Sequence, residues 1–281
     1  MTTQNAYATL AEFKDYWRSR GGEIRADASD DTVIEFLLRA ASRLIDSETG
    51  RHFYPYYETR YYSVPDGDSL DVRLLKLDND LLEVDTVTNG DGTVIPSTEY
   101  KLVPKNNTPH SGVRLNGTST YYWTSDASGD TESVISIAGF WGYHNRYSDA
   151  WESTTTANEA MDASETDYTV TTHVGFSVGD LIRFDNEIGY VSSIDTNILT
   201  ILRGVNGTTA ATHLTGISIS IWKIMDECRN ACIEIANAAY NRRFGVSTNN
   251  TETITASGIV LSPRDIPPLA ADFIRAYRRY V

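Results

Sequence analysis

The chain has 281 residues, of which 41% are hydrophobic and 22% charged, a composition typical of a folded protein with one or two hydrophobic cores. Its formal net charge is −14, and a chain this acidic repels a phosphate backbone, which argues against binding to DNA through a broad basic surface. The N-terminus lacks a basic segment followed by an apolar run, and no apolar stretch reaches 18 residues, so we expect no export, no membrane partner and synthesis in the cytoplasm.

The first fifty residues predict two helices. Residues 9–20 begin with Thr9 and Glu12 at the spacing of a capping box, in which each residue satisfies a backbone N–H of the other. Residues 31–49 carry apolar side chains at helical spacing and are followed by Gly50, a typical helix stop. We therefore expect a short helix followed by a longer one.

Residues 57–143 change to short runs of β-branched and aromatic residues separated by turn residues, a pattern that favours strands. The Asn-Gly-Asp-Gly sequence at 89–92 predicts a hairpin turn. We expect an antiparallel sheet in which most strands pair with neighbours in sequence. The candidate strands are 58–64, 81–87, 93–96, 100–103, 113–115 and 133–140.

Residues 144–165 are rich in Ser, Thr, Asn and acidic residues, which is typical of a surface linker. Residues 166–222 contain strand patterns separated by glycines, which favours a small closed β-barrel. Because a helical pattern resumes immediately afterwards, we interpret this barrel-like unit as an insertion.

Residues 223–243 predict a third helix, which we expect to pack against the helix at 31–49. It carries the two cysteines of the chain, Cys228 and Cys232, and no other cysteine is present to complete a zinc site. We expect them to be buried, reduced and structural. A last helix, 269–280, follows a proline-rich stretch.

These elements predict an α+β fold. Its core, residues 1–143 and 223–281, combines about four helices with an antiparallel sheet, and it is interrupted by the linker at 144–165 and the β-barrel-like domain at 166–222.

The sequence contains no pattern that indicates catalysis. Its Gly-x-Gly triplets do not open a helix, and its five histidines lie in separate segments. Paired acids could serve glycoside hydrolysis, but 38 acidic residues produce such pairs by chance, and we interpret them as helix-start charges or solvated turns. The pairs are Asp30 with Asp31, Asp78 with Asp80, and Asp185 with Glu187. We therefore expect a protein that is not an enzyme, with no catalytic residue, metal or cofactor.

The C-terminal helix carries the basic group of an otherwise acidic chain. Residues 1–143 and 144–222 have net charges of −9 and −7, whereas 223–281 have +2. Two interpretations of Arg275, Arg278 and Arg279 remain open. They can offset the dipole at a helix C-terminus, or they can dock to an acidic groove of another protein.

Five segments, in this order, resemble the head-to-tail connector or adaptor (head-completion) proteins of long-tailed bacteriophages. AASRLIDSETGRHF resembles the end of that family's second helix, and LLEVDTVTNGDGTVIPSTEYKLVP its hairpin. ISIAGFWGY is similar to its Ala-Gly strand, ECRNACIEIANAAYNRR to its third helix, and IPPLAADFIRAYRRYV to its last. The departure is at 144–222, where the family passes directly from strand to helix. Residues 188–213 resemble an accessory module of other phage virion proteins.

The resemblance implies a virion protein of the neck, at the interface between head and tail. Its copies, about twelve, would form a closed cyclic ring beneath the portal protein, extend the DNA channel for ejection, and provide a platform for the next head-completion or tail protein. Genomic DNA would pass without specific binding. Arg275, Arg278, Arg279 and Tyr280 are then the expected portal-docking residues, and no channel-lining residue is assigned.

A second class of function is also open. Tyr121, Tyr122, Trp123 and Trp141 could form a stacking surface for sugars, which would make the chain a carbohydrate- or receptor-binding β protein of a virion. The same residues could equally belong to a hydrophobic core.

Overall fold

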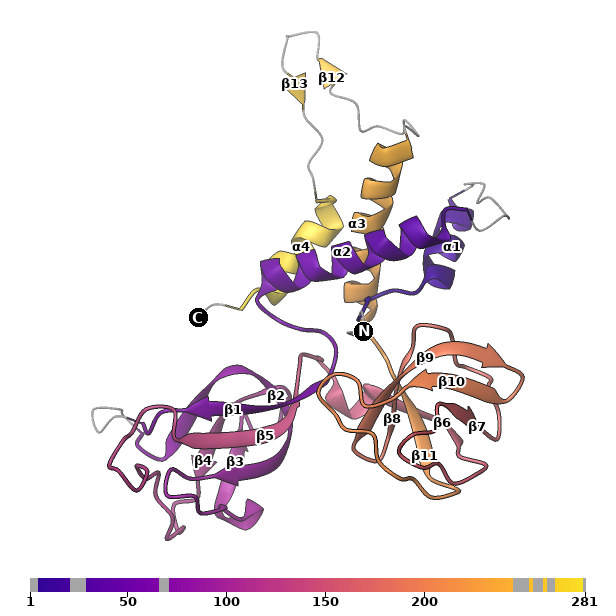
Figure 1. Cartoon of the computed structure of the whole chain (residues 1–281). Coiled ribbons are helices and arrows are strands. Elements are labelled where there is room, and N and C mark those ends of the chain that lie inside the picture. The colour runs from indigo at the N-terminus through magenta and orange to yellow at the C-terminus, as the bar shows by residue number, and fades with distance from the viewer. Residues whose placement is uncertain are drawn as a thin grey trace. The chain divides into compact units, whose positions relative to one another are not determined.

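The computed structural model describes residues 5–20, 29–65, 71–244, 253–254, 260–261 and 266–279. The chain packs as two compact units. A helical unit comprises residues 1–51, 177–180 and 224–280, and a β unit comprises residues 52–176 and 181–223 (Figure 1). We expected the helices and the first sheet to share one core, whereas the packing groups the two sheets together and the helices apart.

The helical unit contains the four expected helices: α1 (Leu10–Ser19), α2 (Asp31–Thr49), α3 (Asp226–Phe244) and α4 (Pro268–Tyr277). The capping box is confirmed, since the Thr9 N–H donates to the Glu12 carboxylate at 2.7 Å and the Glu12 N–H to the Thr9 hydroxyl at 3.2 Å. α2 ends at Gly50, whose φ of +66° is the left-handed conformation that suits glycine.

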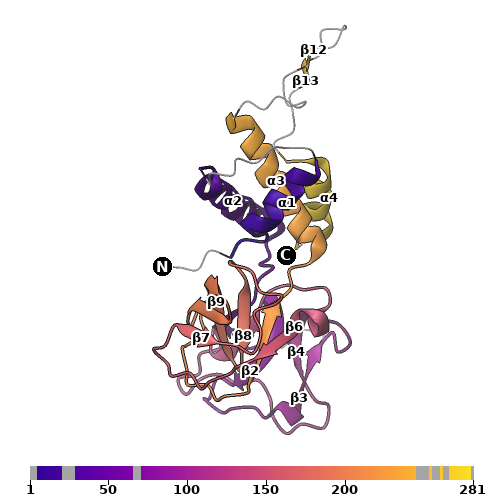
Figure 2. The ribbon, with the colours of Figure 1, turned by 90° about the vertical axis from the view of Figure 1, so that its right-hand side faces the viewer.

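α3 packs against α2, as predicted, and Figure 2 shows the helices together from the side. Cys228 and Cys232 are free and fully buried, and the Cys232 Sγ lies 3.4 Å from the Ser42 hydroxyl of α2. Burial raises the pKa of the Cys232 thiol to about 11, so this thiol stays protonated at neutral pH. The expectation of buried structural thiols is confirmed.

The first sheet of the β unit has five antiparallel strands in the order β1-β5-β2-β4-β3. The strands are β1 (Tyr56–Tyr62), β2 (Leu74–Thr88), β3 (Tyr100–Val103), β4 (His110–Leu115) and β5 (Ile135–Trp141), and the short 3-10 helix η1 (Ser97–Glu99) precedes β3. The expected pairing of sequence neighbours is wrong except for β3 with β4. Pairing in this sheet is decided by which apolar faces share the core, and that choice is not local.

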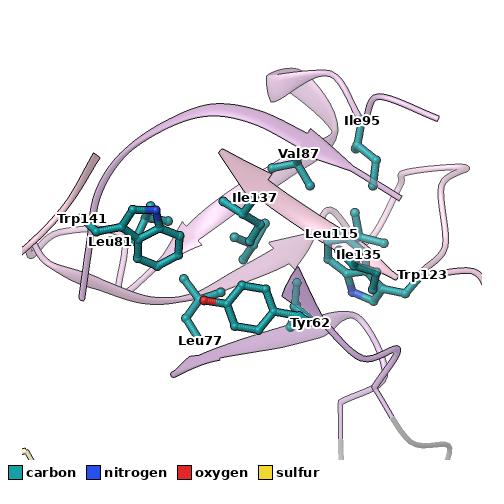
Figure 3. Packing of buried hydrophobic residues seen from close by; sticks show 12 residues of the cluster. Tyr62, Leu77, Leu81, Val87, Ile95, Leu115, Trp123, Ile135, Ile137 and Trp141 are labelled. Atoms are coloured by element: carbon teal, nitrogen blue, oxygen red, sulfur yellow. The ribbon is translucent and has the colours of Figure 1, made fainter. Parts of the chain in front are cut away.

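The predicted turn at 89–92 is present, because the Gly92 N–H donates to the Asn89 carbonyl at 2.9 Å. The strand expected at 93–96 is reduced to an isolated bridge between Thr88 and Val94. The core of the sheet is formed by buried side chains of β1, β2, β4 and β5 and of two connecting segments (Figure 3). Tyr100 and Leu102 of β3 pack against it. Trp141, Leu81 and Ile137 are fully buried there.

Packing explains the glycines of the Ala-Gly strand. A Cβ atom on Gly139 would lie 2.1 Å from the Glu83 carbonyl oxygen of β2. Gly142 has a φ of +137°, and a Cβ there would lie 2.5 Å from the Tyr54 carbonyl oxygen. The close approach of neighbouring backbones therefore requires glycine at both positions.

The second sheet has six antiparallel strands in the order β6-β11-β8-β9-β10-β7. The strands are β6 (Trp151–Thr156), β7 (Asp167–Thr169), β8 (Leu181–Phe184), β9 (Glu187–Asp195), β10 (Ile198–Leu202) and β11 (Ser218–Trp222). β6 and the 3-10 helix η2 (Tyr147–Asp149) lie in the segment expected to be a linker. The Ser- and Thr-rich sequence of this segment is compatible with an edge strand that has one solvent-exposed face, as well as with a loop.

The predicted closed barrel is not confirmed, because β6 and β7 are the two edges of the sheet. An isolated bridge between Ala157 and Val170 joins the chain just beyond these strands. β7 has three residues and spans about 10 Å, which is too short for a full closing ladder.

Two further short strands, β12 (Thr253–Ile254) and β13 (Val260–Leu261), pair with each other. None of the helices in the described ranges is long and apolar enough to cross a membrane.

Candidate functional site

Two of the predicted docking residues, Arg278 and Arg279, lie where the C-terminal end of α4 meets the C-terminal end of α2. α4 starts with Pro268 at a position where a missing N–H costs nothing. It buries Ala270, Phe273 and Ile274, which recur at helical spacing and face the bundle. This packing places the arginines beyond the last turn of α4 next to the last turn of α2.

Arg278 is used within the chain. Its Nε donates to the backbone carbonyl of Glu48 at 2.8 Å, and its Nη2 donates to the Glu48 carboxylate at 2.7 Å. The last carbonyls of a helix lack helical partners and carry the negative end of the dipole. Since the last turn of α2 contains no basic residue, Arg278 supplies the cation that caps α2.

A second arginine makes the reciprocal contact. Arg51 follows the end of α2, and its Nε donates to the carbonyl of Tyr277, the last residue of α4, at 2.8 Å. The backbone N–H of Arg279 also donates to the Thr49 carbonyl at 2.8 Å. We call this arrangement of Glu48, Arg51, Tyr277 and Arg278 the reciprocal cap, because each helix end is capped from the other.

Arg275 has a different environment. Its side chain is 72% exposed, and its described ion pair is with Asp272, at 3.4 Å and one turn away. Such exposed pairs contribute little stability. Tyr280 lies outside the described residues. Of the two open interpretations, the helix dipole accounts for Arg278, although the dipole is that of α2 and not of α4. Arg275 has the more exposed side chain of the two arginines, at 72% against 47% for Arg278.

A buried charged cluster in the six-stranded sheet was not suggested by the sequence. Arg203 donates to both carboxylate oxygens of Glu187, at 2.6 and 2.8 Å. The two ring nitrogens of His213 lie 2.9 Å from Glu187 and 2.9 Å from Asp185. The side chains of Glu187, Arg203 and His213 are at most 5% exposed. The interpretation as a solvated turn is therefore wrong for Glu187, whereas Asp185 is 61% exposed.

The hydrogen bonds of this cluster indicate a structural role. Glu187 also accepts the backbone N–H groups of Gly204 and Ala211, at 3.0 and 2.8 Å. Burial, the largest single influence, favours the neutral carboxyl, but the hydrogen bonds from Arg203 and His213 outweigh it and lower the pKa of Glu187. Both carboxylate oxygens accept hydrogen bonds and are shielded from solvent, so the cluster holds the connection between β10 and β11 onto the start of β9.

A second ion pair joins the two sheets of the β unit. Arg183 of β8 donates to both carboxylate oxygens of Glu83 of β2, each at 2.9 Å. The Tyr147 hydroxyl donates to the same carboxylate, and the guanidinium carbon lies 4.6 Å from the centre of the Phe140 ring. Burial favours the neutral form of Glu83, yet the bonds from Arg183 and Tyr147 lower its pKa. A bidentate, ring-stacked arginine therefore holds the six-stranded sheet against the five-stranded one.

The aromatic residues considered for sugar binding do not share one exposed surface. Trp123 and Trp141 are 8% and 0% exposed and belong to the core in Figure 3. Tyr121 packs against the same core. Tyr122 is 60% exposed, and the Arg73 guanidinium lies over its ring at 5.1 Å. Four such positions do not form a stacking platform.

The other acid pairs also bind neighbours within the chain. Asp30 accepts from the Tyr240 hydroxyl at 2.8 Å, and Asp31 pairs with Lys14. Asp78 binds Arg60 at 2.9 Å, and Asp80 is 6% exposed. Within the described parts of the chain, no group of three or more His, Cys, Asp or Glu side chains could hold a metal ion.

No known protein-family model matches this chain, and no curated protein matches it.

Proposed function

We propose that this chain is a structural virion protein, a head-to-tail adaptor. In this proposal its copies form a ring of about twelve beneath the portal protein. The ring extends the DNA channel and provides the platform for the next head-completion or tail protein. The protein acts in the neck of the virion, is assembled in the host cytoplasm, and has neither enzymatic activity nor a cofactor.

The reciprocal cap is the observation that supports the proposal most directly. The segments that resemble the second and last helices of the adaptor family are 40–53 and 266–281, at opposite ends of the chain. Their residues meet through Arg51 with Tyr277 and Arg278 with Glu48, which are 226 and 230 positions apart. A shared helical core built from both ends of the chain is expected of an adaptor whose middle carries an insertion.

The ends of the six-stranded sheet support an insertion that begins at β6, earlier than the predicted start at residue 166. Trp151 at the start of β6 pairs with Trp222 at the end of β11, and the Lys223 N–H donates to the Ala150 carbonyl at 2.8 Å. The chain therefore leaves and re-enters the adaptor core at neighbouring points. We propose that the inserted sheet is a barrel-like module whose edges are drawn together by the bridge between Ala157 and Val170, and that it serves decoration or contact with capsid or tail.

The charge distribution favours passage of DNA without binding. The β unit contains 22 acidic and 10 basic residues, whereas the helical unit contains 16 acidic and 14 basic residues. An acidic surface repels the phosphate backbone, so a duplex can slide past it. The portal-docking role of Arg275, Arg278, Arg279 and Tyr280 stays a prediction, and it now depends mainly on Arg275.

The carbohydrate-binding alternative has less support, because Trp123 and Trp141 are core residues. The two functions predict different assemblies. Negative-stain images of the purified chain, alone and with the portal protein of the same virus, should show rings or rings stacked on portal. A chain that stays monomeric in both samples would contradict the adaptor proposal, and binding on a glycan array by such a monomer would favour the alternative.

A further inference from the structure

His213 bridges two acidic side chains in the interior of the β unit. Its Nδ1 lies 2.9 Å from a carboxylate oxygen of Asp185, and its Nε2 lies 2.9 Å from a carboxylate oxygen of Glu187. The His213 side chain is 2% exposed. The ring of Phe184 packs edge-on against it, with 4.7 Å between the ring centres. The two hydrogen bonds of the imidazole are therefore made with the protein and not with solvent.

The two contacts determine the charge of the ring. A carboxylate only accepts hydrogen bonds, and a neutral imidazole has one N–H and one acceptor nitrogen. In either neutral tautomer, a lone pair of the ring would face a carboxylate oxygen at 2.9 Å. Burial favours the neutral carboxyl of Glu187, but the hydrogen bonds that it accepts lower its pKa. Asp185 is 61% exposed, and an exposed carboxyl is ionised at neutral pH. An imidazolium donates to both.

The charges within this cluster balance only when the ring is protonated. Asp185 and Glu187 supply two negative charges, and Arg203, which binds both oxygens of Glu187, supplies one positive charge. The protonated His213 ring is the second positive charge. A neutral ring would leave a net negative charge at a site from which solvent is largely excluded, which is costly.

The remaining titratable groups around the cluster favour the same state. Tyr168 of β7 lies near Arg203 and Asp185, and burial raises its pKa to about 12, so it is uncharged at neutral pH. Three further acids interact electrostatically with Arg203 or Tyr168 and add negative charge on this side of the sheet. They are Glu159, Asp162 and Glu165.

The cluster fastens both ends of the segment 203–213, whose middle reaches the five-stranded sheet. Glu187 accepts hydrogen bonds from the start and from the end of the segment. The donors are the side chains of Arg203 and His213 and the backbone N–H groups of Gly204 and Ala211. Between these points, the Asn206 carbonyl accepts the N–H of Tyr57 of β1 at 2.8 Å, and the Asn206 amide donates to the Pro55 carbonyl at 2.9 Å.

Asp185 connects the same histidine to a second link between the sheets. It lies in the turn between β8 and β9 with a φ of +53°, a left-handed conformation that residues other than glycine adopt less readily. Its backbone carbonyl accepts the Nε of Arg183 at 2.8 Å, and Arg183 binds the Glu83 carboxylate of β2. The contact between His213 and Asp185 therefore holds the turn that positions Arg183.

We propose that His213 is a buried imidazolium that acts as a pH-sensitive fastener between the two sheets. While protonated, it holds the segment 203–213 at Glu187 and the β8–β9 turn at Asp185. A proton that the fold holds stabilises the fold at low pH, and this stabilisation is lost as pH rises and the proton dissociates. Both links to the five-stranded sheet then loosen. The fastener lies within the β unit and is independent of the adaptor proposal.

The charge of the ring can be measured on the unaltered chain. Nuclear magnetic resonance of the imidazole nitrogens should show that both nitrogens of His213 carry protons at neutral pH. His144 is the internal comparison, because its Nδ1 accepts the Arg146 N–H at 3.0 Å and its ring therefore carries a single N–H. A His213 ring with one N–H at neutral pH would overturn the proposal.

Hydrogen exchange tests the link to the five-stranded sheet. After correction for the intrinsic effect of pH, the Tyr57 N–H should exchange about tenfold faster at pH 9 than at pH 6. The amides of β4, which pairs with β2 and β3, should show no such change. Exchange of Tyr57 that does not depend on pH would mean that no fastener exists.

A substitution assigns the pH dependence to His213. His213→Gln keeps one hydrogen-bond donor and cannot carry the charge, so Tyr57 should exchange fast at both pH values. His173→Gln is the matched control, because the His173 ring binds the Asn197 amide and not an acid, and it should keep the pH dependence of the unaltered chain. A pH dependence that persists in His213→Gln would contradict the proposal. If His213→Gln does not fold, the two measurements on the unaltered chain still decide.

Discussion

Arg278 binds Glu48 twice, through the backbone carbonyl and through the carboxylate, although 230 positions separate the two residues. The contact gives α2 a cation at its C-terminal end, where its own last turn has none. Arg51 donates in turn to the Tyr277 carbonyl at the end of α4, whose own last turn already carries Arg275. The ends of the two helices are therefore stabilised together, and weakening one should loosen the other.

Replacing Arg278 by alanine should destabilise the helical unit. A hydrogen-bonded cation at a helix C-terminus contributes about 1 kcal/mol when partly exposed, and the Arg278 side chain is 47% exposed. We expect Arg278→Ala to lower the melting temperature by about 3 °C, which far-ultraviolet circular dichroism can measure. Arg275→Ala is the control and should change it little. Equal melting of the two variants would mean that the reciprocal cap does not contribute.

Replacing Glu187 by glutamine should leave the buried Arg203 guanidinium without a negatively charged partner and with one acceptor oxygen in place of two. We expect the free energy of unfolding to fall by about 3 kcal/mol at neutral pH. Because the folded-state pKa of Glu187 is lowered, its ionised form stabilises the fold above the unfolded-state pKa of about 4.3, and this contribution is lost as pH falls through the folded-state pKa. Urea unfolding at several pH values should therefore show the difference between the two proteins shrinking at acid pH. Glu132→Gln, at an exposed position, is the control, and a difference that stays constant with pH would contradict the assignment.

Gly207 should not tolerate a side chain. Its φ is +83°, and a Cβ would lie 2.1 Å from the Tyr57 carbonyl oxygen. Gly216 has a φ of +85° with open space around it, and Gly117 has open space without a positive φ. Calorimetry should show the largest loss of unfolding free energy for Gly207→Ala, a smaller one for Gly216→Ala and the smallest for Gly117→Ala. We expect a loss of about 2 kcal/mol or more for Gly207→Ala and about 1 kcal/mol for Gly216→Ala. Equal losses of unfolding free energy in Gly207→Ala and Gly216→Ala would show that the backbone at Tyr57 can move to accommodate the added Cβ.

Arg183 and Glu83 should be energetically coupled. In a double-mutant cycle of Arg183→Met and Glu83→Gln, we expect an interaction energy of about 1 kcal/mol or more, because the pair is bidentate and stacked on Phe140. Hydrogen exchange should also show faster opening of β8 in Arg183→Met. The corresponding cycle of Arg60→Met with Asp78→Asn, within the first sheet, serves as comparison and should leave exchange in β8 unchanged. Additive effects at Arg183 and Glu83 would mean that the two sheets are held by other contacts.

The contacts of the candidate site could be predicted from the sequence only in part. The basic group at 275–279 and its two possible uses were visible from spacing and charge. The partner of Arg278 was not, because Glu48 belongs to a helix at the other end of the chain. The buried cluster of Glu187, Arg203 and His213 gave no signal either, since its members are 16 and 26 positions from Glu187.

The sequence by itself determined the four helices, the turn at 89–92, the glycine stop of α2 and the buried thiols of α3. These features depend on capping, backbone conformation and apolar spacing, which act over a few residues. Tertiary structure alone decided that β1 pairs with β5, that the second sheet keeps two edges, and which carboxylate or carbonyl each arginine binds. Those outcomes depend on which distant surfaces can be buried together, and a local pattern of residues carries no information about its partner.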